Sequence, residues 1–402
     1  MILHTMIDYD TLRIIWWALI GIILGAYAIT DGFDLGTGML LPFVAKTDTE
    51  RRIVINTVGP VWEGNQVWLI LGGGAIFAAW PALYAVSFSG FYLAMFILLA
   101  ALIVRPVAFK YRSKEESHRW RSRWDAALCI TGFVPALIFG VAMGNVLLGV
   151  PFRLEPQTLR IFYDGTLLGL LNPFALLCGL VGVAMMVMQG ASWIAVKTEG
   201  LVWERARYYG MAAAVLTVLL YALGGVALWL FVDGYQITSA VVTDGPSNPM
   251  MKTVATATAA WFANYQAHPW TLAFPALGLG GAALAGLSLL AHKDKLAFFF
   301  SSASIAGILI NMGVVTFPFM LPSSIDPNAS LTVWDASSSH FTLFTMLVAT
   351  AIFLPLIMVY TLWVYRVMTG KVRHTDFNDH GPLRKPRPSG RGQARQFLTR
   401  AP

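Results

Sequence analysis

The longest uncharged stretch of this chain runs for 41 residues, from Gly64 to Val104. A helix that crosses a bilayer needs about 20 apolar residues, so this stretch alone has room for two crossings. Over the whole chain, 57% of residues are hydrophobic and only 12% are charged, whereas a soluble domain carries roughly 25% charged residues. Lipid offers no partner to an unpaired backbone group, so apolar runs of this length predict transmembrane helices. They exclude a soluble globular chain and a disordered one.

Apolar runs separated by polar breaks predict about nine membrane spans in an all-α, polytopic transmembrane protein. The expected ranges are 12–40, 54–79, 83–104, 125–149, 172–195, 208–231, 270–291, 296–318 and 341–365. The first half of the second range is only moderately apolar, so an eight-span chain without it is the alternative. The N-terminus, with Asp8 and Asp10 and no basic stretch, does not predict a secretory signal peptide.

Lysine and arginine residues are distributed unevenly over the predicted loops. With nine spans, 24 of the 28 lie on one side, and seven of these fall in segment 105–125, beginning with Arg105. Eight spans with a cytoplasmic N-terminus give 22 inside and six outside. Because basic residues are retained in the cytoplasm, the larger asymmetry favours nine spans, with the N-terminus outside and the C-terminus inside.

The chain is expected to divide into a transmembrane domain, residues 1–370, and a basic tail, residues 371–402. The tail is rich in Pro, Gly and Arg, which predicts a disordered cytoplasmic segment. The net charge of +7 thus has a membrane explanation, and we expect no nucleic-acid partner.

Three carboxylates stand out in the first 63 residues: Asp31, Asp34 and Glu63. A charge at the bilayer centre costs about 2.5–3.5 kcal/mol on insertion scales. Asp31 and Asp34 are three residues apart and share a helix face. With nine spans, all three acids fall on the cytoplasmic side of the membrane centre. One interpretation is that they pair with arginine or backbone groups and hold helices together; the other is a relay that takes protons from the cytoplasm.

Haem iron takes axial ligands from His, Met, Cys or Tyr, and none of the seven histidines lies in the middle of a predicted span. We therefore expect this chain to bind no haem by itself and to hold no metal. Cys129 and Cys178 both lie in apolar runs and are expected to be small core residues rather than a disulfide or a metal pair.

Several stretches together resemble subunit II of cytochrome bd-type quinol oxidases, over residues 6–370. They are TDGFDLGTGML, DTERRIVIN, PVWEGNQVWLI, FAAWPALY, FSGFYLAM, RPVAFKYRSK, GNVLLGVPF, LNPFALLCGL, FPFMLPSS and SLTVWDASSS. The resemblance implies two helical bundles plus one peripheral helix, in the bacterial cytoplasmic (inner) membrane. It also implies a haem-bearing subunit I with two b-type haems and one d-type haem, which oxidises quinol and reduces O2 to water. Whether a small single-span subunit joins them stays open.

The resemblance also implies roles for individual residues. Acidic residues of this subunit are implicated in delivering cytoplasmic protons, which points to Asp31, Asp34 and Glu63. The family's Trp-acid-Gly-Asn-Gln motif falls on residues 62–66, and Glu63 stands where many members have Asp. The uncharged helix around Trp68 is a candidate contact with the haem subunit and a candidate oxygen path, because oxygen partitions into apolar surroundings.

Two rival functions follow from the same buried acids. A proton-coupled transporter or channel acting alone would also need them, although no pair of broken helices in an inverted repeat is visible. A purely structural membrane subunit that stabilises a haem partner is the other. A neighbouring gene for a histidine-bearing homologue would argue against the transporter.

Overall fold

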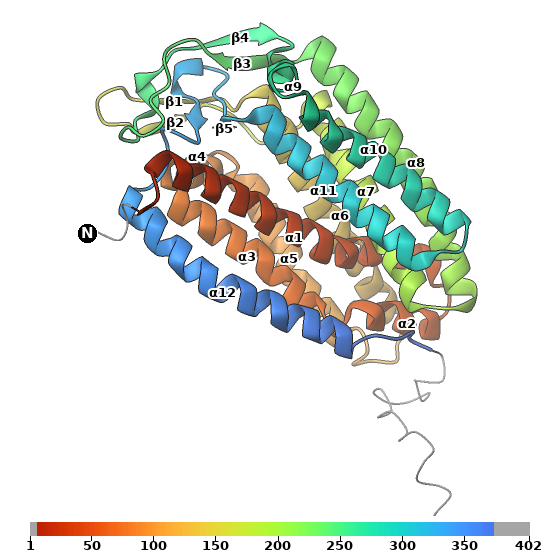
Figure 1. Cartoon of the computed structure of the whole chain (residues 1–402). Coiled ribbons are helices and arrows are strands. Elements are labelled where there is room, and N and C mark those ends of the chain that lie inside the picture. Colours follow the sequence, from red (N-terminus) through yellow and green to blue (C-terminus); the bar gives the residue numbers. More distant parts are fainter. Residues whose placement is uncertain (1–5, 374–402) are drawn as a thin grey trace, which may run out of the picture.

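The computed structural model describes residues 6–373 and is almost entirely helical (Figure 1). Within these residues twelve helices follow the chain. They are α1 (Tyr9–Val44), α2 (Asp48–Val58), α3 (Trp62–Ala79), α4 (Pro81–Gly90), α5 (Tyr92–Tyr111), α6 (His118–Leu148), α7 (Pro173–Lys197), α8 (Gly200–Phe231), α9 (Ala263–Ala267), α10 (Ala273–Leu290), α11 (Asp294–Thr316) and α12 (His340–Val367). The predicted tail from residue 374 onward lies outside the described residues.

Short strands pair in the loops at one end of the helices, the end drawn at the top of Figure 1. Each pair is antiparallel and two-stranded. The strands are β1 (Phe152–Leu154) with β2 (Ile161–Tyr163), β3 (Asp233–Ile237) with β4 (Val254–Thr258), and β5 (Phe319–Leu321) with β6 (Leu331–Thr332). We call this the strand end of the molecule, and the opposite end, where α2 lies, the α2 end.

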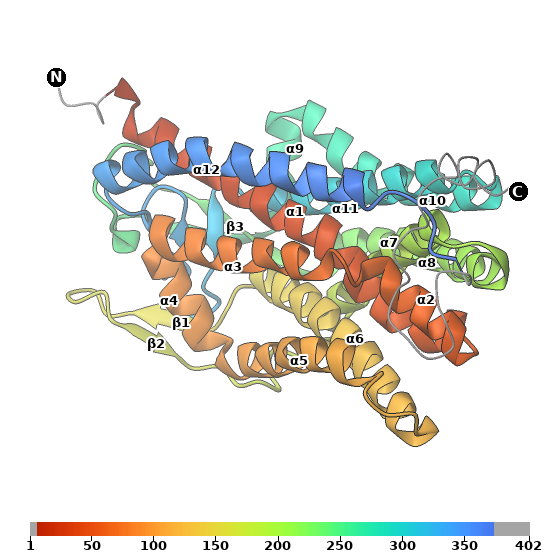
Figure 2. The same ribbon diagram turned by 90° about the horizontal axis from the view of Figure 1, so that it is seen from below.

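The long helices form two bundles and one outlying helix, as expected. In the first bundle α1 packs against α3 and α6, and α5 against α6; in the second, α7, α8, α10 and α11 pack in sequence. The bundles meet where α7 contacts α1 and α6. Figures 1 and 2 show α12 on the outside, beside α1 and α3. The long helices form the apolar layer, and the short strands and turns lie outside it, where water can satisfy their backbone groups.

Eight of the described helices are long and apolar enough to cross a membrane, and α3 is not among them. It nevertheless runs from near the α2 end toward the strand end, as a crossing helix would. Its C-terminal end reaches the strand end, where the carbonyl oxygen of Ala79 accepts a hydrogen bond from the amide of Ser338. Eighteen residues span about 27 Å at 1.5 Å per residue, close to the ~30 Å of hydrocarbon. Each of the nine predicted segments therefore overlaps a long helix, and the number of crossings and the side that is cytoplasmic stay predictions.

Two of the predicted span boundaries are wrong. The second range, 54–79, is interrupted between α2 and α3 at Pro60, where proline lacks the amide hydrogen that would continue the helix. The third range, 83–104, starts in α4, and its membrane helix, α5, continues to Tyr111. The prediction stopped before Arg105 because a charge usually marks the end of an apolar run.

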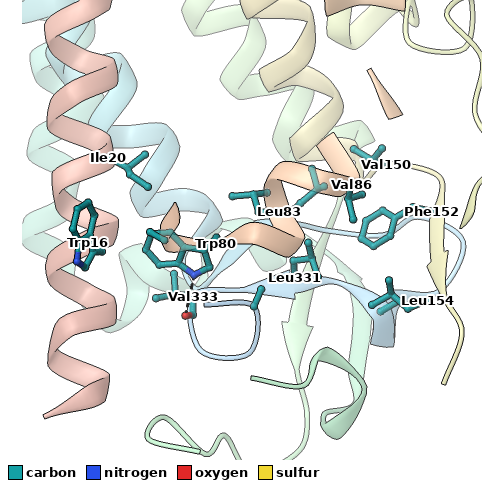
Figure 3. Close-up of a cluster of buried hydrophobic side chains, with 14 of the residues drawn as sticks. Trp16, Ile20, Trp80, Leu83, Val86, Val150, Phe152, Leu154, Leu331 and Val333 are labelled. Atoms are coloured by element: carbon teal, nitrogen blue, oxygen red, sulfur yellow. Dashed lines mark hydrogen bonds between the residues drawn. The ribbon is translucent and has the colours of Figure 1, made fainter. Parts of the chain in front are cut away.

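The largest apolar cluster lies at the strand end and joins α1, α4 and the β5–β6 hairpin (Figure 3). Trp80, fully buried between α3 and α4, donates its indole N–H to the carbonyl oxygen of Val333 at 3.3 Å. Trp16 of α1 and Phe152 of β1 belong to the same cluster. Burial of these large aromatic side chains stabilises the strand end. It also fixes the place where the chain leaves α3 and turns back through α4 into α5.

The tightest contact between the bundles is made by glycines. A Cβ atom added to Gly36 of α1 would collide with the backbone of Met186 in α7, and one added to Gly190 would collide with the backbone of Gly36. Such close helix approach needs small residues. This contact sets the distance between α1 and α7, and α1 is the helix that carries Asp31 and Asp34.

Candidate functional site

Asp31 and Asp34 are buried on one face of α1 and share a single arginine. Arg105 of α5, 2% exposed, places Nη1 2.8 Å from Oδ1 of Asp31 and Nη2 3.7 Å from Oδ2 of Asp34. The two acids are three residues apart on a helix, so they point the same way. Two carboxylates and one guanidinium leave one negative charge over if all three are ionised.

The prediction that Arg105 belongs to the basic loop segment 105–125 is wrong. This arginine lies inside α5, with apolar neighbours before it and Pro106 after it. An isolated guanidinium is very costly in an apolar layer, and the two aspartates compensate that cost. The sequence held a signal for this pairing, because Arg105 continues an apolar run and the chain has two acids, Asp31 and Asp34, that need a positive partner.

Asn65 and Tyr365 complete the site, and the sequence analysis assigned neither of them a role. The Asn65 side chain, 1% exposed, donates from Nδ2 to Oδ2 of Asp34 at 2.7 Å. The hydroxyl of Tyr365, near the end of α12, donates to Oδ1 of Asn65 at 2.5 Å. Helices α1, α3, α5 and α12 therefore meet at one polar centre inside the apolar layer.

Glu63 lies at a similar depth but on the other side of α3. It is two positions before Asn65, which amounts to about 3 Å along the helix axis and about 200° around it. Asn65 is buried against Asp34, whereas Glu63 is exposed on the surface of this chain. The structure thus brings Asp31 and Asp34 together and leaves Glu63 facing outward, with Gln66 half-exposed beside it.

Trp68 points into the molecule. It is 7% exposed and packs with Ile23 and Tyr27 of α1. The large apolar side chains exposed on α3 are Val67, Ile70 and Phe77, at 51%, 72% and 57%. A contact of α3 with another subunit would thus be made by these three residues, and the oxygen-path role of Trp68 stays a prediction.

A second charged cluster lies at the α2 end. Arg112, the C-cap residue of α5, pairs with Asp125 of α6 at 2.5 Å and with Asp48 of α2 at 2.9 Å. Arg51 also reaches Asp125, at 2.8 Å. These pairs join α2, α5 and α6, and so fix the short helix that leads into α3 and Glu63.

The histidines of the described residues all lie at helix ends or in turns. They are His118, His268, His292 and His340. Within residues 6–373, no three His, Cys, Asp or Glu side chains are grouped as metal ligands. The acid–arginine centre between α1, α3, α5 and α12 is the strongest candidate site, and the expectation that this chain binds no haem by itself stays a prediction.

Known proteins similar to this chain are named as subunits of bacterial cytochrome oxidases. The family described as "Cytochrome bd terminal oxidase subunit II" matches residues 12–368. The probable cytochrome oxidase subunit 2 of Haemophilus influenzae is 47% identical over 378 residues, which are 93% of this chain and 99% of that protein. The cytochrome bd-I ubiquinol oxidase subunit 2 of Escherichia coli is 47% identical over 371 residues, 92% of this chain and 98% of that protein.

More distant proteins extend the likeness. The cytochrome bd ubiquinol oxidase subunit 2 of Bacillus subtilis is 28% identical over 368 residues, 91% of this chain and 98% of that protein. A chain in the structure of bd oxidase from Geobacillus thermodenitrificans superposes with a TM-score of 0.67 at 17% identity, covering 89% of this chain and 98% of that one. At that identity the superposition shows a shared fold.

Proposed function

Because the chain belongs to the cytochrome bd terminal oxidase subunit II family, we propose that it carries protons from the α2 end toward the oxygen-reducing haems of its partner. The protein is a subunit of an oxidoreductase and a multi-pass bacterial membrane protein. Its partner in this proposal is a haem-bearing subunit I with two b-type haems and one d-type haem. Its relatives are named as ubiquinol oxidases, and we assign the same quinol class to this complex.

The observation that carries the proposal is the depth of the acids. Asp34 is ten residues from the end of α1, about 15 Å along the axis from the α2 end. Glu63 lies at nearly the same level on the outward face of α3. Asp31 and Asp34 then act as an inner proton store, and Glu63 as the group nearest the partner. Oδ1 of Asp34 is buried without a hydrogen-bond partner in the described residues, which leaves it open to a proton.

The distribution of basic residues supports the direction of transfer. Arg13, Arg153, Arg160 and Lys252 lie at the strand end, where Arg153 pairs with Asp164 and Lys252 with Asp335. The larger number of basic residues lies at the α2 end, among them Arg112, Arg121 and Arg205. Basic residues are retained in the cytoplasm, so the α2 end is cytoplasmic in this proposal. The N-terminus is then periplasmic, and the three acids lie on the side from which protons come.

The chief rival is a purely structural role. Arg105 pairs with both aspartates, and that pairing alone would hold α1 to α5. A stand-alone transporter is excluded, since the chain is subunit II of an oxidase over its full matched length. Glu63 distinguishes a proton-carrying role from a structural one, because it is exposed and forms no ion pair within residues 6–373.

The test is a pair of substitutions in the complete oxidase complex. Glu63→Gln keeps the size of the side chain and removes its proton, so the complex should assemble with a normal haem spectrum and lose most quinol oxidase turnover. Glu63→Asp keeps the carboxyl group and should retain much of that turnover. Loss of haem or of assembly in Glu63→Gln would favour the structural role, and parental turnover would exclude Glu63 from the proton path.

A further inference from the structure

The hydrogen bonds around Asp34 form a directed chain that begins on α12. The Tyr365 hydroxyl donates to Oδ1 of Asn65 at 2.5 Å, and Nδ2 of Asn65 donates to Oδ2 of Asp34 at 2.7 Å. Tyr365 is held in place by aromatic contacts, with its ring centroid 6.1 Å from that of Trp193 and 6.3 Å from that of Phe33. The hydroxyl is therefore fixed at the position from which it donates.

This pair of hydrogen bonds determines which way the Asn65 amide faces. An amide has one accepting and one donating end. Because its oxygen accepts from Tyr365, its NH2 group faces Asp34. An NH2 group only donates, so Oδ2 of Asp34 must accept and stays unprotonated. A proton on Asp34 must then sit on Oδ1, the oxygen that has no hydrogen-bond partner among residues 6–373.

The two aspartates are not equivalent in this setting. Arg105 lies 2.8 Å from Asp31 but 3.7 Å from Asp34, beyond hydrogen-bond distance. Asp31 is thus the closer counter-ion of the guanidinium. Asp34 keeps one oxygen satisfied by Asn65 and the other free, which is the arrangement expected of a group that takes up and releases a proton.

We infer that Tyr365 is a positioning residue: by fixing the amide of Asn65 it confines proton exchange on Asp34 to Oδ1. This inference rests on the proposed proton-carrying role of the site. It also explains why α12, otherwise peripheral, reaches the buried centre with one polar side chain. The titratable and charged groups that face Asp34 are Asp31 and Tyr27 from α1, Arg105 from α5 and Tyr365 from α12.

The test compares Tyr365→Phe with Tyr360→Phe in the purified complex. Tyr360 lies on the same helix, is 62% exposed and serves as the matched control. Without the Tyr365 hydroxyl the amide oxygen loses its donor, and only the donations of Nδ2 to Asp34 at 2.7 Å and to the carbonyl oxygen of Thr30 at 3.4 Å still orient the amide. When the amide turns, its oxygen accepts from protonated Asp34, which then holds its proton more tightly. Turnover should fall about three- to tenfold, the effect of one hydrogen bond, with the KM for quinol and the haem spectrum unchanged.

The pH profile distinguishes positioning from packing. A proton held more tightly stays on Asp34 to higher pH, so the alkaline limb of the turnover profile should move to higher pH in Tyr365→Phe and stay in place in Tyr360→Phe. An unshifted limb, or loss of haem or assembly, would overturn the inference and assign Tyr365 to packing.

Asp34→Asn separates this inference from the proposed function. If Asp34→Asn turns over at the parental rate, the acid is not on the proton path and the proposed function loses its inner store. If Asp34→Asn is slow while Tyr365→Phe matches its control, only the role of Tyr365 is wrong.

Discussion

At the scale of single residues, Arg105 decides whether two carboxylates can be buried side by side in α1. It is 2% exposed, and its partners are 0% and 2% exposed. Moving charges out of water costs several kcal/mol per ion, which an ion pair recovers only in good geometry. The close contact with Asp31 and the amide of Asn65 on Asp34 supply that geometry. Removing the arginine would leave the acids without a counter-charge.

We predict that Arg105→Gln destabilises the complex by about 3–5 kcal/mol, the cost of breaking one partner out of a buried pair. The measurement is the thermal unfolding midpoint and the yield of the haem-loaded complex. Arg119→Gln, at an exposed position of α6, should change neither. Adding Asp31→Asn to Arg105→Gln should restore part of the loss, and a double variant no better than the single one would contradict the pairing.

At the scale of elements, α3 links the candidate site to the topology of the chain. Its first turn carries Glu63, its inward face carries Asn65, and its C-terminal end packs at the strand end. A capping box precedes it on α2, where Thr47 and Glu50 satisfy each other's backbone amides. Helix α2 therefore begins at a defined point at the α2 end, which makes the loop before it a good position for a reporter.

We predict that a reporter active only in the periplasm is inactive when fused after Thr47, because nine crossings put this loop in the cytoplasm. The same reporter fused after Thr253, in the long loop at the strand end, should be active and serves as the positive control. Activity after Thr47 would favour the eight-span alternative, in which α3 does not cross.

The long helices were predictable from sequence because every helix that spans lipid needs an apolar run of about the same length. Three predicted ranges, 12–40, 208–231 and 341–365, lie inside α1, α8 and α12, and 125–149 ends one residue past α6. What hydropathy could not supply was partnership. Arg105 was assigned to a loop, and Asn65 and Tyr365 were not assigned to the site. Their roles depend on contacts between α1, α3, α5 and α12 that are up to 300 residues apart in sequence. The same limit applied to Glu63, whose outward direction follows from the half-turn between it and Asn65.

At the scale of the whole molecule, the two bundles and α12 form a scaffold whose buried side chains are mostly apolar. The fold is retained at 17% identity, with a TM-score of 0.67, so the packing tolerates wide substitution. Against that background a centre with one arginine, two aspartates, an asparagine and a tyrosine is costly. Its position on the α2 side of the apolar layer fits a group that exchanges protons with that side.

The most direct test of the central claim is proton uptake during a single turnover. The fully reduced complex is mixed with oxygen, and a pH-sensitive dye follows proton uptake while absorbance follows the haems. In Glu63→Gln and Asp34→Asn, oxygen should bind at the parental rate and proton uptake should be slower than in the parent complex, with Glu63→Asp close to the parent. Parental uptake in both variants with intact haem spectra would contradict the account, because protons would then reach the haems by a route outside these acids.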